Sequence, residues 1–256
     1  MSTSTDSVSA VPSDVDGVEI KVTLGADQVD AGLAAFALAA GAAERRRIWF
    51  CEYLSGSSGP TALPLLSRGV IVRVRKREDH RHDSTLKLRG PEGCIDPDAW
   101  RQRTRAFAKD ARIEGDWVGD RHLLSASLDS HIEDGRIKEV LAERPPRVSR
   151  LLSQAQEDLA GEWLLGLGRL ELLGPIRALK WDPGVEGLEH GIAAELWELD
   201  DRLRFLELSV REEHDPIGAQ RRLEDAVRRA GLDFGSIQET KTRMVLEHLA
   251  TAAQSR

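Results

Sequence analysis

The chain has 256 residues, of which 41% are hydrophobic, enough for one large domain with its own core. Its formal net charge of -7 makes the surface acidic overall, which disfavours nucleic acid and anionic membranes as partners. There is no run of 18 or more apolar residues, and residues 1–16 lack the basic start and apolar stretch of a secretory signal, so we expect a cytoplasmic protein.

Hydrophobic patterning predicts a single domain of strands and helices. Residues 1–16 are rich in Ser, Thr and Asp and are predicted to be a disordered tail before a domain at residues 17–254. Apolar alternation and β-branched residues predict strands at residues 18–24, 48–54, 69–78, 84–89, 111–117, 170–181, 192–199 and 203–212. Helices are predicted at residues 27–40, 96–108, 217–230 and 241–252, with a helical insertion at about 131–165.

Charge in five of these strands falls on alternate positions. Residues two apart in a strand share a face, so each of the five has one ionic face and one apolar face. The polar residues that share faces are Glu19, Lys21 and Thr23; Arg73, Arg75 and Arg77; Lys87 and Arg89; Arg112, Glu114 and Asp116; and Glu207, Ser209 and Arg211.

One ionic face alone is most simply interpreted as a face that meets water. Five of them favour another arrangement, because the helices carry apolar faces that need a sheet surface to cover. If the helices pack outside, the ionic faces turn inward around the lumen of a closed barrel. Clustered basic groups repel by roughly 4 kcal/mol for a pair 4 Å apart at an effective dielectric of 20, so a polyanion is the expected occupant. Carboxylates beside it are suitable ligands for Mg²⁺ or Mn²⁺.

The charged strands resemble those of the CYTH, or triphosphate tunnel metalloenzyme, family, in the same order over about residues 18–249. The segments VRVRK, STLKLR and RIEGD resemble its paired arginines, its Thr-x-Lys strand and its Arg-x-Glu strand. VEIK resembles the end of its Glu-x-Glu-x-Lys strand, with Gly17 in place of the first Glu. ELWELDDRLRFLELS resembles its closing strand pair, with Ser209 in place of the last Glu. The resemblance implies an α+β fold with an antiparallel eight-stranded closed barrel, a charged lumen and helices packed outside.

The resemblance also implies roles for individual residues. Lys21 and Glu114 are the implied catalytic residues. The implied phosphate ligands are Arg73, Arg75, Lys87, Arg89, Arg112, Arg177, Lys180 and Lys241, although Arg177 and Lys180 differ in parity and only one can point inward. The implied metal ligands are Glu19, Glu114, Asp116, Asp200 and Glu207.

These residues lead to one main functional hypothesis and two rivals. The main one is an enzyme, a monomer or homodimer, that hydrolyses tripolyphosphate, thiamine triphosphate or a nucleoside triphosphate with Mg²⁺ or Mn²⁺. The missing carboxylates at Gly17 and Ser209 favour a non-catalytic module that binds polyphosphate or a nucleotide. An adenylyl cyclase is the third and least favoured hypothesis, because no residue identifies an adenine pocket. The His80-x-His82 pair falls in a predicted hairpin turn and is interpreted as part of a solvated loop rather than a metal site.

Overall fold

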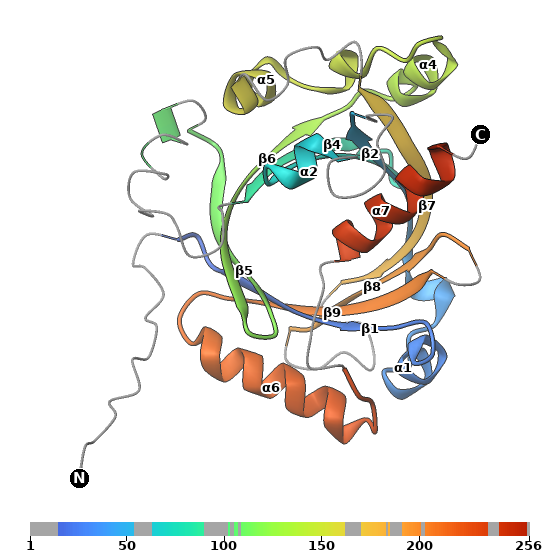
Figure 1. Cartoon of the computed structure of the whole chain (residues 1–256). Coiled ribbons are helices and arrows are strands. Elements are labelled where there is room, and N and C mark those ends of the chain that lie inside the picture. Colours follow the sequence, from blue (N-terminus) through green and yellow to red (C-terminus); the bar gives the residue numbers. More distant parts are fainter. Residues whose placement is uncertain are drawn as a thin grey trace.

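Nine strands form one closed barrel in the computed structural model (Figure 1). The structure describes residues 15–53, 63–89, 102, 105–106, 109–161, 170–182, 184, 191–200, 203–234 and 241–254. The strands are β1 (Val18–Leu24), β2 (Glu44–Glu52), β3 (Val70–Arg77), β4 (Asp83–Arg89), β5 (Arg112–Val118), β6 (Arg121–His131), β7 (Glu171–Trp181), β8 (Ala193–Glu198) and β9 (Arg204–Glu212). Their order around the wall is β1-β5-β6-β4-β3-β2-β7-β8-β9, and β9 pairs with β1 to close it.

The barrel differs from the predicted one in two ways. It has nine strands rather than eight, because residues of β6 pair with both β4 and β5. It is mixed rather than antiparallel, because β1 runs parallel to β5, with Val18 aligned to Gly115. The sequence of β6, RHLLSASLDSH, escaped prediction because its inward residues include the small Ser125 and Ser127, which weaken the alternation. The structure also begins β2 at Glu44, four residues before the prediction.

The described helices are α1 (Val29–Ala35), α2 (Pro64–Ser67), α4 (Arg136–Ala142), α5 (Gln154–Ala160), α6 (Pro216–Arg229) and α7 (Lys241–Gln254), with 3-10 turns η1 (Ala40–Ala42) and η3 (Val148–Leu151). The predicted insertion at 131–165 overlaps the end of β6 and continues as α4, η3 and α5. The predicted tail at 1–16 and the helix at 96–108 lie mostly outside the described residues. No helix in the described part of the chain is long and apolar enough to span a membrane.

Two hydrophobic clusters lie on the outer face of the barrel, as predicted. The helices α1 and α6 cover β1, β8 and β9, where Leu223 and Val227 pack in one cluster with Leu208. The short helices α4 and α5 cover β3, β4 and β6 in another cluster that includes Val72 and Leu86. These strand residues alternate with the charged ones, so the apolar faces point outward under the helices.

A third cluster corrects the prediction that all helices pack outside. In it α7 places Val245, Leu246 and Ala250 against Phe50 of β2 and Phe205 of β9. Phe50 shares its strand face with Arg46, and Phe205 shares its face with Glu207, so both point into the barrel. Figure 1 shows α7 over the barrel opening. Part of the barrel interior is therefore apolar and is covered by the C-terminal helix.

Candidate functional site: a charged tunnel inside the barrel

The barrel encloses a cavity of 430 Å³. Among the described residues, eleven basic and six acidic side chains line it, a clear basic excess inside an acidic protein. The basic ones are Lys21, Arg46, Arg73, Arg75, Arg77, Lys87, Arg89, Arg112, Lys180, Arg211 and Lys241, and the acidic ones are Glu19, Glu114, Asp116, Asp129, Glu195 and Glu207. All the polar residues that alternation placed on one face of their strands line this cavity.

The strand β3 supplies the most basic stretch of the wall. Arg75 donates from Nε to Asp83 Oδ1 at 2.6 Å, and Arg77 donates to the other Asp83 oxygen at 2.8 Å. Burial and the neighbouring Arg73 lower the pKa of Arg75 to about 10, against the opposing effect of Asp83. The Arg73 Nε is buried and has no hydrogen-bond partner among the described residues. An unpaired buried donor costs free energy, and this donor belongs to a guanidinium that lines the cavity.

Asp116 is the centre of a second group. It is 2% exposed, and its carboxylate lies 2.7 Å from Lys21 Nζ and 2.9 Å from both Lys87 Nζ and Arg89 Nη2. Burial alone would raise the pKa of Asp116, but the three cations hold it well below its ordinary range. Asp116 is therefore ionised at neutral pH and holds three cavity cations in place.

Glu19 and Glu114 are each paired with a cation. Glu19 lies 2.8 Å from Lys21 Nζ, and although burial opposes the shift, Lys21 and Lys87 lower the pKa of Glu19 to about 2. Glu114 lies 2.6 Å from Arg211 Nη1. A Cβ at Gly17 would lie 3.2 Å from Arg211 Nε, so the absent side chain at position 17 leaves room for this guanidinium.

A third group joins β8, β9 and α7. Glu195 and Glu207 are aligned opposite each other across the two strands. Lys241 Nζ donates to Glu195 Oε2 and lies 2.8 Å from Glu207 Oε1. The same ammonium lies 4.3 Å from the centre of the Trp197 ring.

Two of the predicted site residues do not line the cavity. Arg177 of β7 is exposed, whereas Lys180 points inward, as their opposite parity requires. Asp200 follows the end of β8, where it accepts a hydrogen bond from the Leu203 backbone and pairs with His248 at 3.0 Å. Its place in the turn between β8 and β9 keeps it out of the cavity. The other predicted site residues all line the cavity.

Several cavity residues were not assigned a role from the sequence. Arg46 was missed because the predicted strand began after it, and Asp129 because β6 was not predicted. Asp129 accepts from Thr85 Oγ1 at 2.5 Å and from Arg112 Nη2 at 2.7 Å. Glu195 lies in a predicted strand, and its alternation with Ala194 and Leu196 could have identified it.

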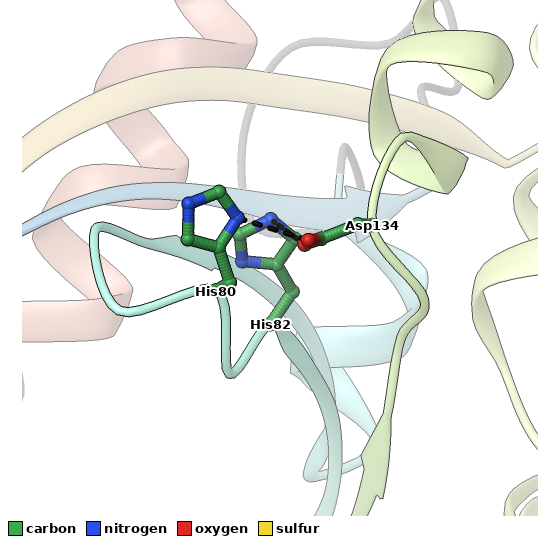
Figure 2. A group of neighbouring side chains, drawn as sticks. All are labelled: His80, His82 and Asp134. Carbon is green, nitrogen blue, oxygen red and sulfur yellow. Dashed lines mark hydrogen bonds and ion pairs between the residues drawn. The ribbon is translucent and has the colours of Figure 1, made fainter.

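The cavity carboxylates have the oxygen chemistry that Mg²⁺ and Mn²⁺ require. Each is also in contact with a lysine or arginine, so an ion would enter by replacing one of these contacts. Within the described residues, the group of three donor side chains close enough to hold a metal ion lies elsewhere, at His80, His82 and Asp134 (Figure 2).

The His80, His82 and Asp134 group joins the turn between β3 and β4 to the segment after β6. Asp134 lies 2.9 Å from His80 Nδ1 and 3.2 Å from His82 Nε2. Both histidine rings point towards Asp134 in Figure 2. His82 is buried, contrary to the predicted solvated loop, and its Nδ1 accepts the Arg77 backbone N–H at 3.2 Å. A neutral His82 with that acceptor carries its proton on Nε2, the atom that lies near Asp134. The hydrogen bond between His80 and Asp134 and the close approach of His82 to Asp134 therefore account for this geometry.

Comparison with known proteins supports the fold. No family model and no curated protein matches the chain. A crystal structure of a candidate adenylate cyclase from Bacillus halodurans matches with a TM-score of 0.56 and 11% identity, over 89% of this chain and 96% of that one. A Hippeastrum protein, named as a candidate adenylyl cyclase with a dominant triphosphatase activity, matches with a TM-score of 0.55 and 15% identity, over 91% of this chain and 96% of that one. The chain therefore shares the closed-barrel fold of these two proteins.

Proposed function

We propose that the tunnel binds a triphosphate-like polyanion and hydrolyses it with the help of Mg²⁺ or Mn²⁺. The observation that carries the proposal is the basic excess in the cavity of an acidic protein, together with the unpaired buried Nε of Arg73. A polyphosphate chain would offset this excess of positive charge and would accept a hydrogen bond from the unpaired Nε–H of Arg73. The triphosphatase activity named for the Hippeastrum protein of the same fold supports the choice of reaction.

In this proposal the basic residues bind and orient the phosphate chain. Arginine presents two parallel donors to a phosphate, which suits Arg73, Arg75, Arg89 and Arg112, and the lysines add point charges. The lysines are Lys87, Lys180 and Lys241. Asp83 and Asp116 hold the arginines and lysines that contact them, so they position phosphate ligands without touching phosphate.

Glu19, Glu114 and Glu207, with Asp116 beside them, are the residues that would hold a divalent ion. Such an ion supplies charge neutralisation on the phosphoryl group and lowers the pKa of a bound water. In hydrolysis, water adds to the terminal phosphorus, the anhydride P–O bond breaks, and orthophosphate leaves. Lys21 would donate a hydrogen bond to the charge that develops on the phosphoryl oxygens. We propose a small-molecule substrate, a cytoplasmic location and a monomer or homodimer.

The second candidate is a module that binds polyphosphate or a nucleotide without turning it over. The specific observation in its favour is that Arg211 lies beside Gly17 and contacts Glu114, where a further carboxylate would help a metal to bind. Both candidates require the same basic wall. They differ in whether the carboxylates exchange their lysine and arginine partners for a metal ion.

Phosphate release from tripolyphosphate and from ATP, with Mg²⁺ or Mn²⁺ present, separates the candidates. Turnover that is abolished by Glu114→Ala or Glu207→Ala supports the hydrolase. Tight binding by calorimetry with no turnover supports the binding module, and conversion of ATP to cyclic AMP and diphosphate would indicate a cyclase. The matched control is Arg177→Ala, which removes an exposed arginine from the same barrel wall and should change nothing. Unchanged binding after Arg73→Ala and Arg75→Ala together would contradict all three.

A further inference from the structure

Two carboxylates of low solvent exposure face each other inside the barrel. Glu195 of β8 is aligned directly opposite Glu207 of β9, and their side chains are 16% and 9% exposed. Directly opposed residues in an antiparallel pair have Cβ atoms about 5 Å apart, and like charges in that position destabilise the sheet. At low solvent exposure the repulsion is poorly screened. The pair therefore requires a cation between its members.

The chain supplies that cation itself. The ammonium of Lys241 contacts an oxygen of each glutamate and lies over the face of Trp197 at 4.3 Å. Lys241 is only 8% exposed, so the ammonium is enclosed by two anions and an aromatic face. Burial would raise the pKa of Glu195, but Lys241, with a smaller effect from Arg46, holds it below its ordinary range. Glu195 is therefore ionised in the free protein.

We propose that Glu195 and Glu207 form a cation site that the ammonium of Lys241 occupies in the free protein, and that Lys241 excludes divalent cations from it there. Glu207 would become available to a divalent ion only when Lys241 leaves it to contact a bound phosphate chain. Lys241 is then a residue that determines cation specificity, in addition to the phosphate contact expected from the sequence. The proposal does not depend on phosphate hydrolysis, because it concerns the free protein and a metal ion alone.

The position of Lys241 in the fold makes it an effective occupant. It is the first residue of α7, and the apolar residues Val245 and Leu246, which follow it along the helix, are buried inside the barrel. The packing of α7 thus tethers the ammonium beside the glutamates, at little further cost in entropy. A free divalent ion must compete with a cation that never diffuses away. Removal of the lysine takes away the ammonium that both glutamates share and leaves Glu195 with the more distant Arg46, at 3.8 Å. Poorly compensated buried anions favour uptake of an ion from solution.

The test is a titration with Mn²⁺ alone, followed by electron paramagnetic resonance, without any phosphate compound. We expect Lys241→Met to bind Mn²⁺ at least about tenfold more tightly than the unaltered protein, because an uncompensated buried charge is strongly unfavourable. The control is Lys76→Met, which removes an exposed lysine from the outer face of β3. It should leave Mn²⁺ affinity unchanged.

The double variant Lys241→Met with Glu195→Gln removes one of the two carboxylates, so it should lose the gain in Mn²⁺ affinity. Equal affinities for the unaltered protein and Lys241→Met would overturn the proposal, and so would a gain that persists in the double variant. Circular dichroism checks that each variant is folded. If Lys241→Met does not fold, Lys241→Gln replaces it in the same titration, since glutamine keeps a donor for one carboxylate but carries no charge.

Discussion

The interior of the barrel has a charged part and an apolar part, built from the same strands. On β9, Phe205 packs under α7, whereas Glu207 and Arg211 on the same strand face line the charged cavity. On β3, Ile71 belongs to the apolar cluster and is followed on its face by Arg73. Alternation thus decides which residues point inward. Their position along the strand decides whether they pack against α7 or line the charged cavity.

The two parts of the barrel interior are stabilised in different ways. The apolar part is filled by α7, whose burial contributes the usual hydrophobic stabilisation. The charged part cannot be filled by an apolar helix, because unpaired buried charges cost several kcal/mol each. It is held by ion pairs in the free protein and retains room for an anion. The charged part should therefore respond to pH and to anions, and the apolar part should respond to neither.

The largest effect is expected from removal of the acidic centre of the charged part. Asp116→Ala leaves Lys21, Lys87 and Arg89 without their shared partner. Loss of one member of a buried ionic group costs about 3–5 kcal/mol, so the free energy of unfolding in urea should fall by that amount. Asp182→Ala, which removes an aspartate that is 68% exposed, should change it by less than about 1 kcal/mol. Similar effects of the two substitutions would mean that the charged part is solvated like a surface.

A slightly smaller effect is expected from the apolar part. Leu246→Ala removes a side chain of α7 that is 2% exposed inside the barrel. The transfer and cavity costs of such a substitution are typically about 3 kcal/mol, measured as the free energy of unfolding. The loss should be the same with and without tripolyphosphate. A loss that disappears when the anion is added would show that the two parts are not separate.

Acid should weaken the charged part. The pKa of Glu19 is lowered from 4.5 to about 2, and that of Asp116 lies well below 3.8. A lowered pKa in the folded state stabilises the fold above the unfolded pKa, and this contribution is lost as pH falls through the folded value. Stability should therefore be maintained down to about pH 4.5 and decline towards pH 2. Chemical denaturation across this range checks it, and the decline should be shallower for Glu19→Gln.

The smallest effect is expected outside the barrel interior, at the exposed contact of His80 with Asp134. The two side chains are 75% and 60% exposed, and such pairs are typically worth less than about 1 kcal/mol. His80→Ala should lower the free energy of unfolding by no more than that. Because His82 Nδ1 already accepts the Arg77 N–H, Zn²⁺ should not raise the melting temperature. A clear rise that His80→Ala abolishes would instead identify a metal site.

Much of the charged part could be predicted from the sequence because it depends on a local rule. Residues two apart share a strand face, and this alone grouped Arg73 with Arg75 and Glu19 with Lys21. The features that the sequence did not predict depend on contacts between residues that are far apart in the chain. The inward apolar residues gave no sign that a helix would enter the barrel, since Phe50 and Phe205 look the same whether they face a helix or another strand. β6 was missed because its pairing with β4 and β5 stabilises a segment whose own alternation is weak.

The parallel pairing of β1 with β5 has a consequence for biosynthesis. β1 fills the gap between β5 and β9, so the wall stays open until the first and last strands meet, with Val18 beside Glu212. A ribosome must deliver nearly all of the described chain before this seam can form. A nascent chain should therefore hold exposed strand edges for most of its synthesis, which makes slow folding and a need for chaperones the expected cost of this topology.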